Sequence, residues 1–572
     1  MALDQTITEQ YRLWCEKAVA DKDVVEELKL MSSDEKKTEE AFYRNLSFGT
    51  GGLRGIIGAG TNRMNVYTVA KASQGLADYV KKNFAPEKRK IAVSYDSRIK
   101  SDLFAKVASG VFAANHIEVA VYPELMPTPC LSFAVRELGC AAGIMITASH
   151  NPARYNGYKV YGPDGCQITT EAAAEILAEI EKLDIFADVQ TGSFEEGMAS
   201  GKISYIGEEV YDAFVENVKR QSCAGGREIN KDVAIVYSPL NGTGLKPVLR
   251  TLRESGYTNI TVVKEQERPD GSFPTCPYPN PEIREAMALG IEYAKKCGAD
   301  LFMATDPDCD RVGVAVKDKK GEYVLLLGNE TGMLLLDYIC SRRTALGSMP
   351  KDPVCIKTIV TSDMAERIAA GYGVRTMNVL TGFKYIGEQI GRLEKEGRVD
   401  SYLFGLEESY GYLSGSYVRD KDAVNAAFLI CEMFAWYRTQ GIGLLEKLEE
   451  LYAEYGYCLN TLHSFYFEGV AGADKMQEIM KRFRQGIDVI GSKKVLECLD
   501  YSKGLDGFPK SNVLKYLLED HCSVVIRPSG TEPKLKVYVS VSADSKETAE
   551  KIEEELMGCV TRSFVENQIN NQ

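Results

Sequence analysis

Histidine is scarce in this sequence, and its cysteines are widely spaced. The 572 residues include 4 His and 15 Cys, and the smallest separation between cysteines is that of Cys130 and Cys140. The sequence therefore contains no CxxC redox motif and no zinc ribbon, and no His pair stands at ligand spacing. We expect no zinc enzyme. We interpret the thiols, several of which lie in apolar runs, as reduced and buried in a cytoplasmic protein.

Long apolar runs are missing as well. The best stretch, residues 426–436, is short and is interrupted by Glu432, so we expect no membrane-spanning helix. The first residues are polar and have a helical period, without the apolar segment of a secretory signal. Lys and Arg total 68 and Asp and Glu 81, a net charge of -13. This acidic balance argues against nucleic acids and anionic membranes as partners.

The common nucleotide-binding motifs are also absent. The sequence has neither G-x-G-x-x-G nor G-x-x-x-x-G-K-[ST]. We therefore expect that any phosphate handled by this protein is not carried by a bound ATP or NAD. The composition itself, 45% hydrophobic and 26% charged, is that of a globular protein.

A strand–helix–strand pattern occurs three times along the chain. Each copy has a β-branched apolar run, an amphipathic helix and a second apolar run, which predicts parallel sheets covered by helices. The copies are expected at residues 90–98, 102–115 and 117–122; at 232–240, 244–255 and 260–264; and at 353–361, 363–371 and 376–380.

The C-terminal region has a different pattern. We expect a hairpin of strands at 522–528 and 534–543, a strand near 465, and helices at 474–485 and 545–557, which is typical of an antiparallel α+β domain. Candidate linkers are 221–231, 317–322 and the region of Gly456. A length of 572 residues favours about four domains. The predicted domains are 1–222, 223–322, 323–456 and 457–572.

Four unusual loops each follow an apolar strand. Ligands of open α/β sheets bind beyond the carboxyl ends of the strands and often between domains. We therefore expect the four loops to meet at one cleft.

The first loop, 147–152, reads TASHNP. Ser149 can carry a phosphoryl group if a cation or a base lies beside it. Taken alone, the loop favours a polar turn, in which Asn-Pro starts the turn and the serine caps it. Lys159 follows nearby.

The second loop, 306–311, reads DPDCDR. Asp306, Asp308 and Asp310 at alternate positions can direct oxygens at one hard cation. An EF-hand is excluded because Arg311 and Lys317 stand where that motif needs Gly and Glu. Three close carboxylates without a cation repel one another, so the loop indicates a divalent metal, above all Mg²⁺.

The third loop, 405–409, reads GLEES. Glu407, Glu408 and Ser409 can bind vicinal sugar hydroxyls, although an exposed acidic turn would look the same. A glycosidase pair is disfavoured because adjacent residues of an extended segment point to opposite sides.

The fourth loop, 527–533, reads RPSGTEP. Arg527, Ser529, Gly530 and Thr531 suit a phosphate, and a plain hairpin turn is the alternative. The Gly-rich segment 49–55, GTGGLRG, is either a second phosphate cradle or a flexible connection.

Together these motifs resemble the α-D-phosphohexomutases. TASHNP, DPDCDR, GLEES and RPSGTEP occur in the family's order, with GTGGLRG before them and Thr381 to Lys384 among them, so the likeness covers nearly the whole chain. The resemblance implies an α/β fold of four domains around a central cleft, three related mixed α/β domains and a C-terminal α+β domain. The long form and the GLEES loop are similar to the phosphoglucomutase/phosphopentomutase branch.

The resemblance also implies roles for residues. Ser149 would be the phosphoserine, with His150 and Lys159 beside it, and Ser149 with Asp306, Asp308 and Asp310 would hold one Mg²⁺. Lys159 is our first candidate for the general acid and base, with His150 and Lys421 as rivals. The residues implied to bind substrate are Thr50, Arg54, Arg311, Thr381, Lys384, Glu407, Ser409, Lys421, Arg527, Ser529, Gly530 and Thr531.

The implied reaction interconverts glucose 1-phosphate and glucose 6-phosphate through glucose 1,6-bisphosphate, which also serves as activator. Pentose phosphates, mannose phosphate and synthesis of the bisphosphate remain alternatives. Two other classes stay open: a Mg²⁺-dependent phosphatase with Asp306 as nucleophile, and an inactive sugar-phosphate sensor. The sequence leaves the oligomeric state open.

Overall fold

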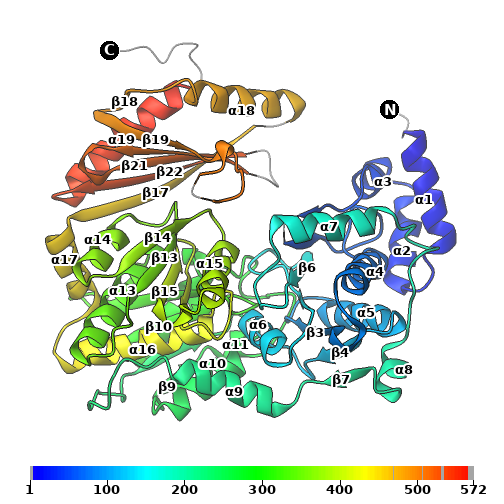
Figure 1. The fold of residues 1–572 in the computed structure, drawn as a ribbon, viewed down its shortest axis with the longest axis horizontal. Helices are drawn as coiled ribbons and strands as arrows, with labels where there is room; N and C mark the ends of the chain where they lie inside the picture. The colour runs from blue at the N-terminus through cyan, green and yellow to red at the C-terminus, as the bar shows by residue number, and fades with distance from the viewer. Residues whose placement is uncertain (1–3, 50, 468, 506, 530–533, 565–572) are drawn as a thin grey trace. The chain divides into compact units, whose positions relative to one another are not determined.

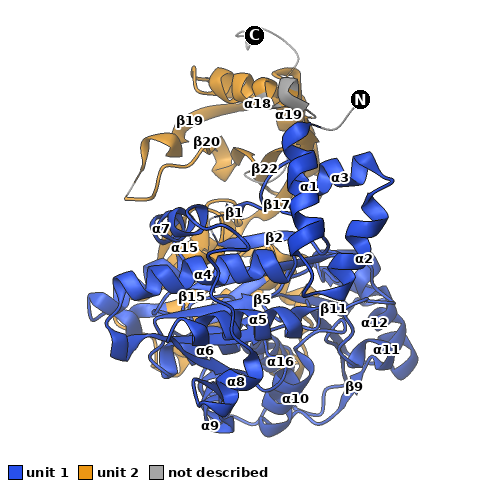
Figure 2. Cartoon of the chain, turned by 90° about the vertical axis from the view of Figure 1, so that its right-hand side faces the viewer, with its two compact units in different colours: residues 1–326, 386–402, 411–435 blue, residues 327–385, 403–410, 436–572 orange. Residues whose placement is uncertain are grey.

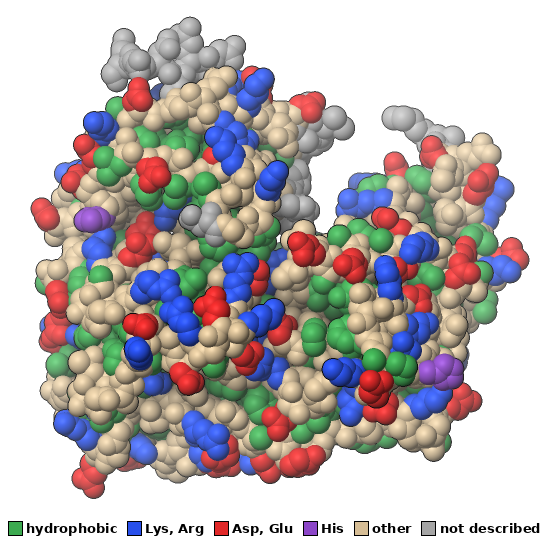
Figure 3. Space-filling view, in the orientation of Figure 1, with side chains coloured by type: hydrophobic (Ala, Val, Ile, Leu, Met, Phe, Trp, Pro, Cys, Tyr) green, Lys and Arg blue, Asp and Glu red, His purple; other side chains and the backbone are tan. Residues whose placement is uncertain are grey.

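The computed structural model describes residues 4–49, 51–467, 469–505, 507–529 and 534–564, in two compact units. Unit 1 comprises residues 1–326, 386–402 and 411–435, and unit 2 comprises 327–385, 403–410 and 436–572 (Figure 2). On the face seen in Figure 3, acidic and basic side chains are interspersed. No helix in the described ranges is both long and apolar enough to cross a membrane.

Unit 1 begins with a layer of three helices, which we call the N-terminal layer (Figure 1). They are α1 (Gln5–Lys17), α2 (Lys22–Met31) and α3 (Glu35–Phe42). An aspartate caps the start of each one, because its carboxylate accepts a backbone N–H of the first turn; these caps are Asp4, Asp21 and Asp34. Trp14 is fully buried and packs edge-on against Phe42 and Tyr67. This aromatic contact attaches the layer to α4 (Val66–Asn83), which carries Tyr67.

The first sheet of unit 1 has seven strands in the order β1-β2-β6-β5-β3-β4-β7. The strands are β1 (Phe48–Gly49), β2 (Gly52–Ile56), β3 (Lys90–Tyr95), β4 (Glu118–Val121), β5 (Ala142–Ile146), β6 (Tyr155–Tyr161) and β7 (Ile203–Tyr205). The accompanying helices are α4 (Val66–Asn83), α5 (Ser101–Ala114), α6 (Thr128–Glu137), α7 (Thr170–Glu181), α8 (Phe194–Ala199) and α9 (Glu208–Lys219). Strands β3, β4, β5 and β7 pair in parallel, whereas β6 runs antiparallel to β5.

The second sheet of unit 1 has the order β12-β11-β10-β8-β9. Its strands are β8 (Ile235–Ser238), β9 (Ile260–Val262), β10 (Leu301–Thr305), β11 (Val312–Lys317) and β12 (Tyr323–Leu326), with helices α10 (Leu245–Glu254), α11 (Lys264–Glu267) and α12 (Arg284–Cys297). Strands β11 and β12 pair antiparallel. The expectation of a linker at 317–322 is therefore wrong: this polar segment is a hairpin turn, and the sheet extends to Leu326.

Unit 2 contains a third α/β layer. Strands β13 (Val354–Thr358) and β14 (Arg375–Val379) pair in parallel beside α13 (Gly328–Ala345), α14 (Met364–Gly371) and α17 (Leu444–Tyr455). Three further elements run across a unit boundary along the chain: α15 (Phe383–Lys395), β15 (Tyr402–Glu407) and α16 (Ala423–Thr439). Strand β16 (Gly411–Ser414) belongs to unit 1.

The C-terminal part of unit 2 is an antiparallel sheet in the order β17-β22-β21-β20-β19-β18. The strands are β17 (Tyr457–Tyr466), β18 (Val489–Ile490), β19 (Lys493–Asp500), β20 (Leu514–Leu518), β21 (Ser523–Pro528) and β22 (Lys534–Ala543), and the helices are α18 (Gly469–Phe483) and α19 (Lys546–Arg562). Short 3₁₀ turns lie at Pro86–Lys88, Val399–Ser401, Tyr501–Lys503 and Glu519–His521.

The three predicted strand–helix–strand units are confirmed. They correspond to β3-α5-β4, β8-α10-β9 and β13-α14-β14, and in each the two strands pair in parallel. The predicted C-terminal hairpin is also present as β21 and β22. The sequence analysis did not expect β18, β19 or β20.

Candidate active site

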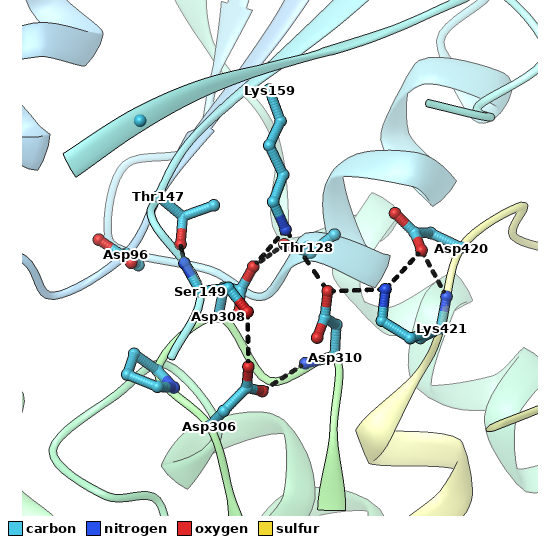
Figure 4. A network of polar contacts seen from close by, with 12 residues as sticks. Asp96, Thr128, Thr147, Ser149, Lys159, Asp306, Asp308, Asp310, Asp420 and Lys421 are labelled. Carbon is cyan, nitrogen blue, oxygen red and sulfur yellow. Dashed lines mark hydrogen bonds and ion pairs between the residues drawn. The ribbon is translucent and has the colours of Figure 1, made fainter. Parts of the chain in front are cut away.

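The reactive-serine candidate lies in the turn that follows β5, the strand of residues 142–146. Ser149 is almost completely buried and has a φ of +53°, a left-handed conformation that is costly for a residue with a side chain. Its backbone N–H donates to Thr147 Oγ1 at 2.8 Å. Its hydroxyl donates to Asp306 Oδ2 at 3.0 Å and lies 3.2 Å from His150 Nδ1 (Figure 4). The serine is thus held against the acidic loop of the second sheet.

The acidic loop follows β10 and gathers three carboxylates. Asp306, Asp308 and Asp310 have exposed fractions of 0%, 0% and 1%. One oxygen of each lies within 4.8 Å of the others. Asp306 Oδ1 accepts the backbone N–H groups of Asp310 and Arg311 at 3.1 and 3.0 Å. Among the described residues, Asp308 Oδ1 and Asp310 Oδ1 have no hydrogen-bond donor. Buried carboxylate oxygens in such a group fit a hard divalent cation.

The charges of the acidic loop interact strongly. Burial, and then the charges of Asp308 and Asp310, raise the pKa of Asp306 well above its ordinary value. Burial works against ionisation of Asp308 too, but the ammonium of Lys159 lowers its pKa below the ordinary value. Mutual repulsion therefore opposes ionisation of all three aspartates at once, and a bound cation would relieve this repulsion.

Two lysines face the acidic loop. Lys159 Nζ, at the end of β6, lies 2.7 Å from Asp308 Oδ2 and 3.4 Å from Asp310 Oδ2, and Lys421 Nζ lies 3.2 Å from Asp310 Oδ2. Burial works to lower the pKa of Lys159, but the two carboxylates raise it above its ordinary value. The two carboxylates outweigh both burial and the neighbouring ammonium of Lys421. Lys159 is thus held protonated.

Other predicted residues of unit 1 lie around this centre. The pKa of His150 is well below its ordinary value, because the ring is buried and then because Arg311 and Arg54 are near, so the imidazole is neutral. Arg311 makes an ion pair with Glu282, and its Nε lies 3.7 Å from Asp310 Oδ1. Arg54 is on β2, opposite Gly157 of β6. Thr50 lies outside the described residues.

The structure adds two residues that the sequence analysis missed. Thr128, at the first turn of α6, donates its hydroxyl to Asp308 Oδ2 at 3.0 Å. Asp420 accepts from Lys421 Nζ at 3.3 Å and from Tyr161 at 2.8 Å, so it orients the lysine. Neither residue stands in an unusual local sequence. Only the pairing of distant segments reveals them.

The third predicted loop lies in unit 2, at the end of β15. Ser409 donates to Glu407 Oε1 at 3.1 Å. Glu408 accepts from Thr358 at 3.0 Å and from Thr361 at 3.2 Å. The two glutamates thus have different partners, which disfavours a catalytic pair. Among the described residues, the buried hydroxyl oxygen of Thr381 has no hydrogen-bond partner.

The other unit 2 candidates lie in two places. Lys384 Nζ lies 5.1 Å from the ring centre of Tyr385. Arg527 is on β21 opposite Lys536, and Ser529 N–H donates to Lys534 O at 2.8 Å. Gly530 and Thr531 lie outside the described residues. Because the four loops are divided between the two units, their meeting at one cleft stays a prediction.

Comparisons with known proteins agree along the chain. Family models of phosphoglucomutase/phosphomannomutase match in order: alpha/beta/alpha domain I at residues 45–185, domain II at 212–321, domain III at 327–455, and the C-terminal domain at 469–558. A phosphoglucomutase of Staphylococcus saprophyticus is 36% identical over 553 residues, covering 94% of this chain and 96% of that protein. One from Staphylococcus aureus is 36% identical over 532 residues, covering 90% and 93%.

Solved structures have the same fold. A phosphoglucomutase (parafusin) from Paramecium, in its open form, gives a TM-score of 0.70 at 18% identity and covers 92% of this chain and 97% of that one. A putative phosphomannomutase from Thermus thermophilus gives 0.68 at 23% identity, covering 91% and 99%. The order of the domain models and the identity over nearly the full length lead to one assignment. This chain belongs to the phosphoglucomutase/phosphomannomutase family, with three α/β/α domains followed by a distinct C-terminal domain.

Proposed function

We propose that this protein interconverts glucose 1-phosphate and glucose 6-phosphate by transferring a phosphoryl group between Ser149 and the sugar. One observation carries the proposal: the Ser149 hydroxyl lies 3.0 Å from a buried carboxylate of a three-aspartate group. A nucleophile that must hold and release a phosphoryl group needs such a site for the accompanying cation. The phosphoglucomutase names of the relatives favour glucose.

We infer that the acidic loop holds one Mg²⁺ through Asp306, Asp308 and Asp310, with Ser149 or its phosphate as a further ligand. The fit rests on the two carboxylate oxygens without a hydrogen-bond donor among the described residues and on the preference of Mg²⁺ for carboxylates. When bound, this cation would neutralise charge that spreads over the transferred phosphoryl group.

In the proposed transfer, one bond to phosphorus is exchanged for another. The bond between phosphorus and phospho-Ser149 Oγ breaks as a bond forms to the free hydroxyl of the hexose phosphate, and the hydroxyl proton leaves to a protein base. The product, glucose 1,6-bisphosphate, turns around and gives its other phosphate to Ser149. The same bisphosphate would activate enzyme whose serine is unmodified.

Proton transfer is assigned to Lys159 first. Its raised pKa keeps the ammonium charged, so Lys159 can stabilise the negative charge that develops on the departing Ser149 oxygen. His150 is the rival, since its neutral ring lies 3.2 Å from Ser149 Oγ and can accept the hydroxyl proton in the reverse step. Lys421 is a second rival.

Substrate contacts are proposed on both units. Glu407 and Ser409 would bind sugar hydroxyls, and Arg527, Ser529, Gly530 and Thr531 the phosphate that does not react. The remaining proposed contacts are Thr50, Arg54, Arg311, Thr381, Lys384 and Lys421. We also propose four domains with limits near residues 222, 326 and 456; the second limit moves from 322 to 326 because β12 completes the second sheet. We further propose a cytoplasmic protein that binds sugar phosphates, with neither nucleic acids nor membranes as partners.

A phosphatase with Asp306 as nucleophile is disfavoured. Oδ1 of that residue accepts two backbone N–H groups and Oδ2 accepts the Ser149 hydroxyl, so both oxygens are engaged.

The proposal is tested by incubation with glucose 1,6-bisphosphate and Mg²⁺, followed by intact mass and peptide mapping. We expect one phosphoryl group on Ser149 and none on the Ser149→Ala variant. Turnover of glucose 1-phosphate should exceed that of ribose 1-phosphate and mannose 1-phosphate measured side by side. Release of free phosphate by Ser149→Ala would instead support a phosphatase, and a faster pentose reaction would change the substrate.

A further inference from the structure

One buried arginine holds the turn that carries the reactive serine. The side chain of Arg98 has an exposed fraction of 0%. It donates to four backbone carbonyls of that turn: Ser149 O at 2.5 Å, Asn151 O, and Pro152 O and Tyr155 O at 3.0 Å each. Because the five N–H donors of arginine form a rigid fork, one side chain fixes the path of the backbone from 149 to 155.

Holding the backbone of this turn stabilises the conformation of Ser149. A left-handed φ costs a residue with a side chain roughly 1 kcal/mol or more, so the turn would relax unless its surroundings held it. The position of the Ser149 hydroxyl against Asp306 depends on this conformation. Arg98 is therefore suited to position the nucleophile, through carbonyl groups rather than through the reacting atoms.

The loop that carries Arg98 is itself anchored. Asp96 pairs with the Arg98 Nε at 3.3 Å and accepts the hydroxyl of Ser101 at 2.7 Å. Asn156 donates to Ser101 Oγ at 3.0 Å, which closes the link between this loop and the strand after the serine turn. Asn156 also donates to Ile99 O at 3.1 Å, and Arg98 forms a β-bridge with Gly271.

The N-terminal layer contacts the same loop. Lys100, also in a left-handed conformation with φ +64°, places its ammonium 2.9 Å from Asp21 and 2.8 Å from Asp23, at the start of α2. A second contact runs in parallel. Glu27 of α2 accepts the N–H of Ala59 at 2.7 Å, two residues from Ile57, whose N–H donates to Arg154 O at 2.8 Å. Two chains of contacts thus lead from α2 to the serine turn.

We propose that the N-terminal layer is a positioning element for phosphoryl transfer, acting through Lys100 and Arg98 on the turn of Ser149. The layer precedes the segment matched by the family's first domain model, which starts at residue 45. The inference rests on the proposed function. It assigns Arg98, Lys100 and Asp21 as positioning residues. Without the layer, the turn would keep its fold but hold the serine less accurately.

The main test is the double variant Asp21→Asn and Asp23→Asn. Asn is as good a helix cap as Asp, so α2 keeps its start while Lys100 loses its ion pairs. Asp34→Asn is the matched control, since Asp34 caps α3 of the same layer by accepting the N–H of Lys37. We measure kcat per molecule whose Ser149 can be phosphorylated, and mass spectrometry counts these molecules. A smaller amount of folded protein therefore does not lower the measured kcat.

We expect kcat per site to fall about 3- to 10-fold with KM within about twofold, because small displacements of a nucleophile slow the step without weakening binding. Lys100→Asn, which tolerates the left-handed conformation, should give the same loss, and combining it with the double variant should add nothing. Lys100→Arg should restore the wild-type rate.

Arg98→Lys should lower kcat per site by about 100-fold or more, since lysine cannot reach four carbonyls. Arg89→Lys is its control, because Arg89 also donates to two backbone carbonyls, Phe84 O and Lys81 O, away from the turn. If Arg98→Lys does not fold, the Asp21 and Asp23 variant decides. Wild-type values of kcat per site in that variant would overturn the inference, and so would a rise in KM alone. An inactive wild-type enzyme would instead overturn the proposed function.

Discussion

Loss of the Asp363 charge should strongly destabilise unit 2. Asp363 lies between two buried lysines: its Oδ1 is 2.9 Å from both Lys357 Nζ and Lys515 Nζ, and the lysine side chains have exposed fractions of 0% and 4%. Ser523 also donates to it at 2.8 Å. Burial opposes ionisation of Asp363, yet the two lysines hold its pKa well below the ordinary value. The carboxylate is the shared counter-ion of both ammonium groups.

The cost of Asp363→Asn follows from what the lysines can then do. Breaking a buried ion pair by removing one partner costs about 3–5 kcal/mol. Each lysine can instead lose its proton, and the free energy of deprotonation is the most that one lysine can cost. At pH 7 this is about 4.6 kcal/mol, because each pH unit below the ordinary lysine pKa near 10.4 costs about 1.4 kcal/mol. Lys357 keeps Thr361 O and the Glu366 carboxylate, whereas Lys515 keeps the uncharged Ile359 O, so Lys515 bears most of the loss. We expect a loss of about 3–5 kcal/mol in the free energy of unfolding of unit 2.

The pH dependence gives a sharper signature. In the variant, an unpaired buried lysine has a folded pKa below its unfolded value, so the unfolded state binds more protons and stability rises with pH. The difference between wild type and variant should therefore shrink as pH rises from 7 to 9, by up to about 1.4 kcal/mol per pH unit where the lysine is fully deprotonated in the folded variant.

The assay is urea unfolding in a Trp14→Phe background. The chain has 2 Trp, and the remaining Trp436 belongs to unit 2, where it stacks on Arg342 at 3.7 Å. The control is Glu366→Gln: Glu366 is a partly exposed second partner of Lys357 and should cost less than about 1 kcal/mol. A loss below about 1 kcal/mol for Asp363→Asn, or a loss independent of pH, would refute the reasoning.

Two further predictions concern unit 1. Asp308→Asn should lower kcat by about 1,000-fold or more with an unchanged circular dichroism spectrum, because it removes a proposed metal ligand and the partner of Lys159. The control is Asp318→Asn in the β11–β12 turn. Unfolding of Asp308→Asn would show that the acidic loop has a structural role instead. Burial raises the pKa of Asp422 to about 6, despite the hydrogen bond from Tyr417. The folded state then binds the extra proton, so this residue's contribution to stability is lost as pH rises from about 4 through 6, by up to about 3 kcal/mol. Asp422→Asn should flatten that slope in urea titrations followed by Trp14, and an unchanged slope would contradict the assignment.

Much of the fold could be read from the sequence because local and tertiary signals agree in the α/β part. The apolar runs at 90–95, 235–238 and 354–358 are buried strands with helices directly after them, and periodicity detects such elements well. Periodicity does not detect strand β19. Its residues Lys493 to Asp500 are mostly exposed or half-buried and alternate weakly, so only pairing with β20 defines the strand.

The sequence predicted several residue types of the site, but not the contacts that join residues far apart in the chain. The three aspartates make the acidic loop recognisable in the sequence, and the structure places Ser149, 157 positions away in the chain, in contact with it. Arg98 gave no such signal, because an arginine after a strand is ordinary and its function depends on carbonyls that lie 51 to 57 positions away. Residues that act through backbone contacts leave little trace in residue type.

The division of unit 1 into three chain segments, 1–326, 386–402 and 411–435, constrains how the protein can be synthesised and dissected. Cys431 of α16 lies 4.0 Å from Met303 of β10, the strand that leads into the acidic loop. A nascent chain that has reached residue 326 therefore still lacks a helix that contacts this strand, and the ribosome must deliver residues 327–385 and 403–410 of unit 2 before unit 1 can close. A gene fragment that ends at residue 326 should yield a protein that aggregates. A gene that joins the three segments of unit 1 directly should instead give a soluble unit 1.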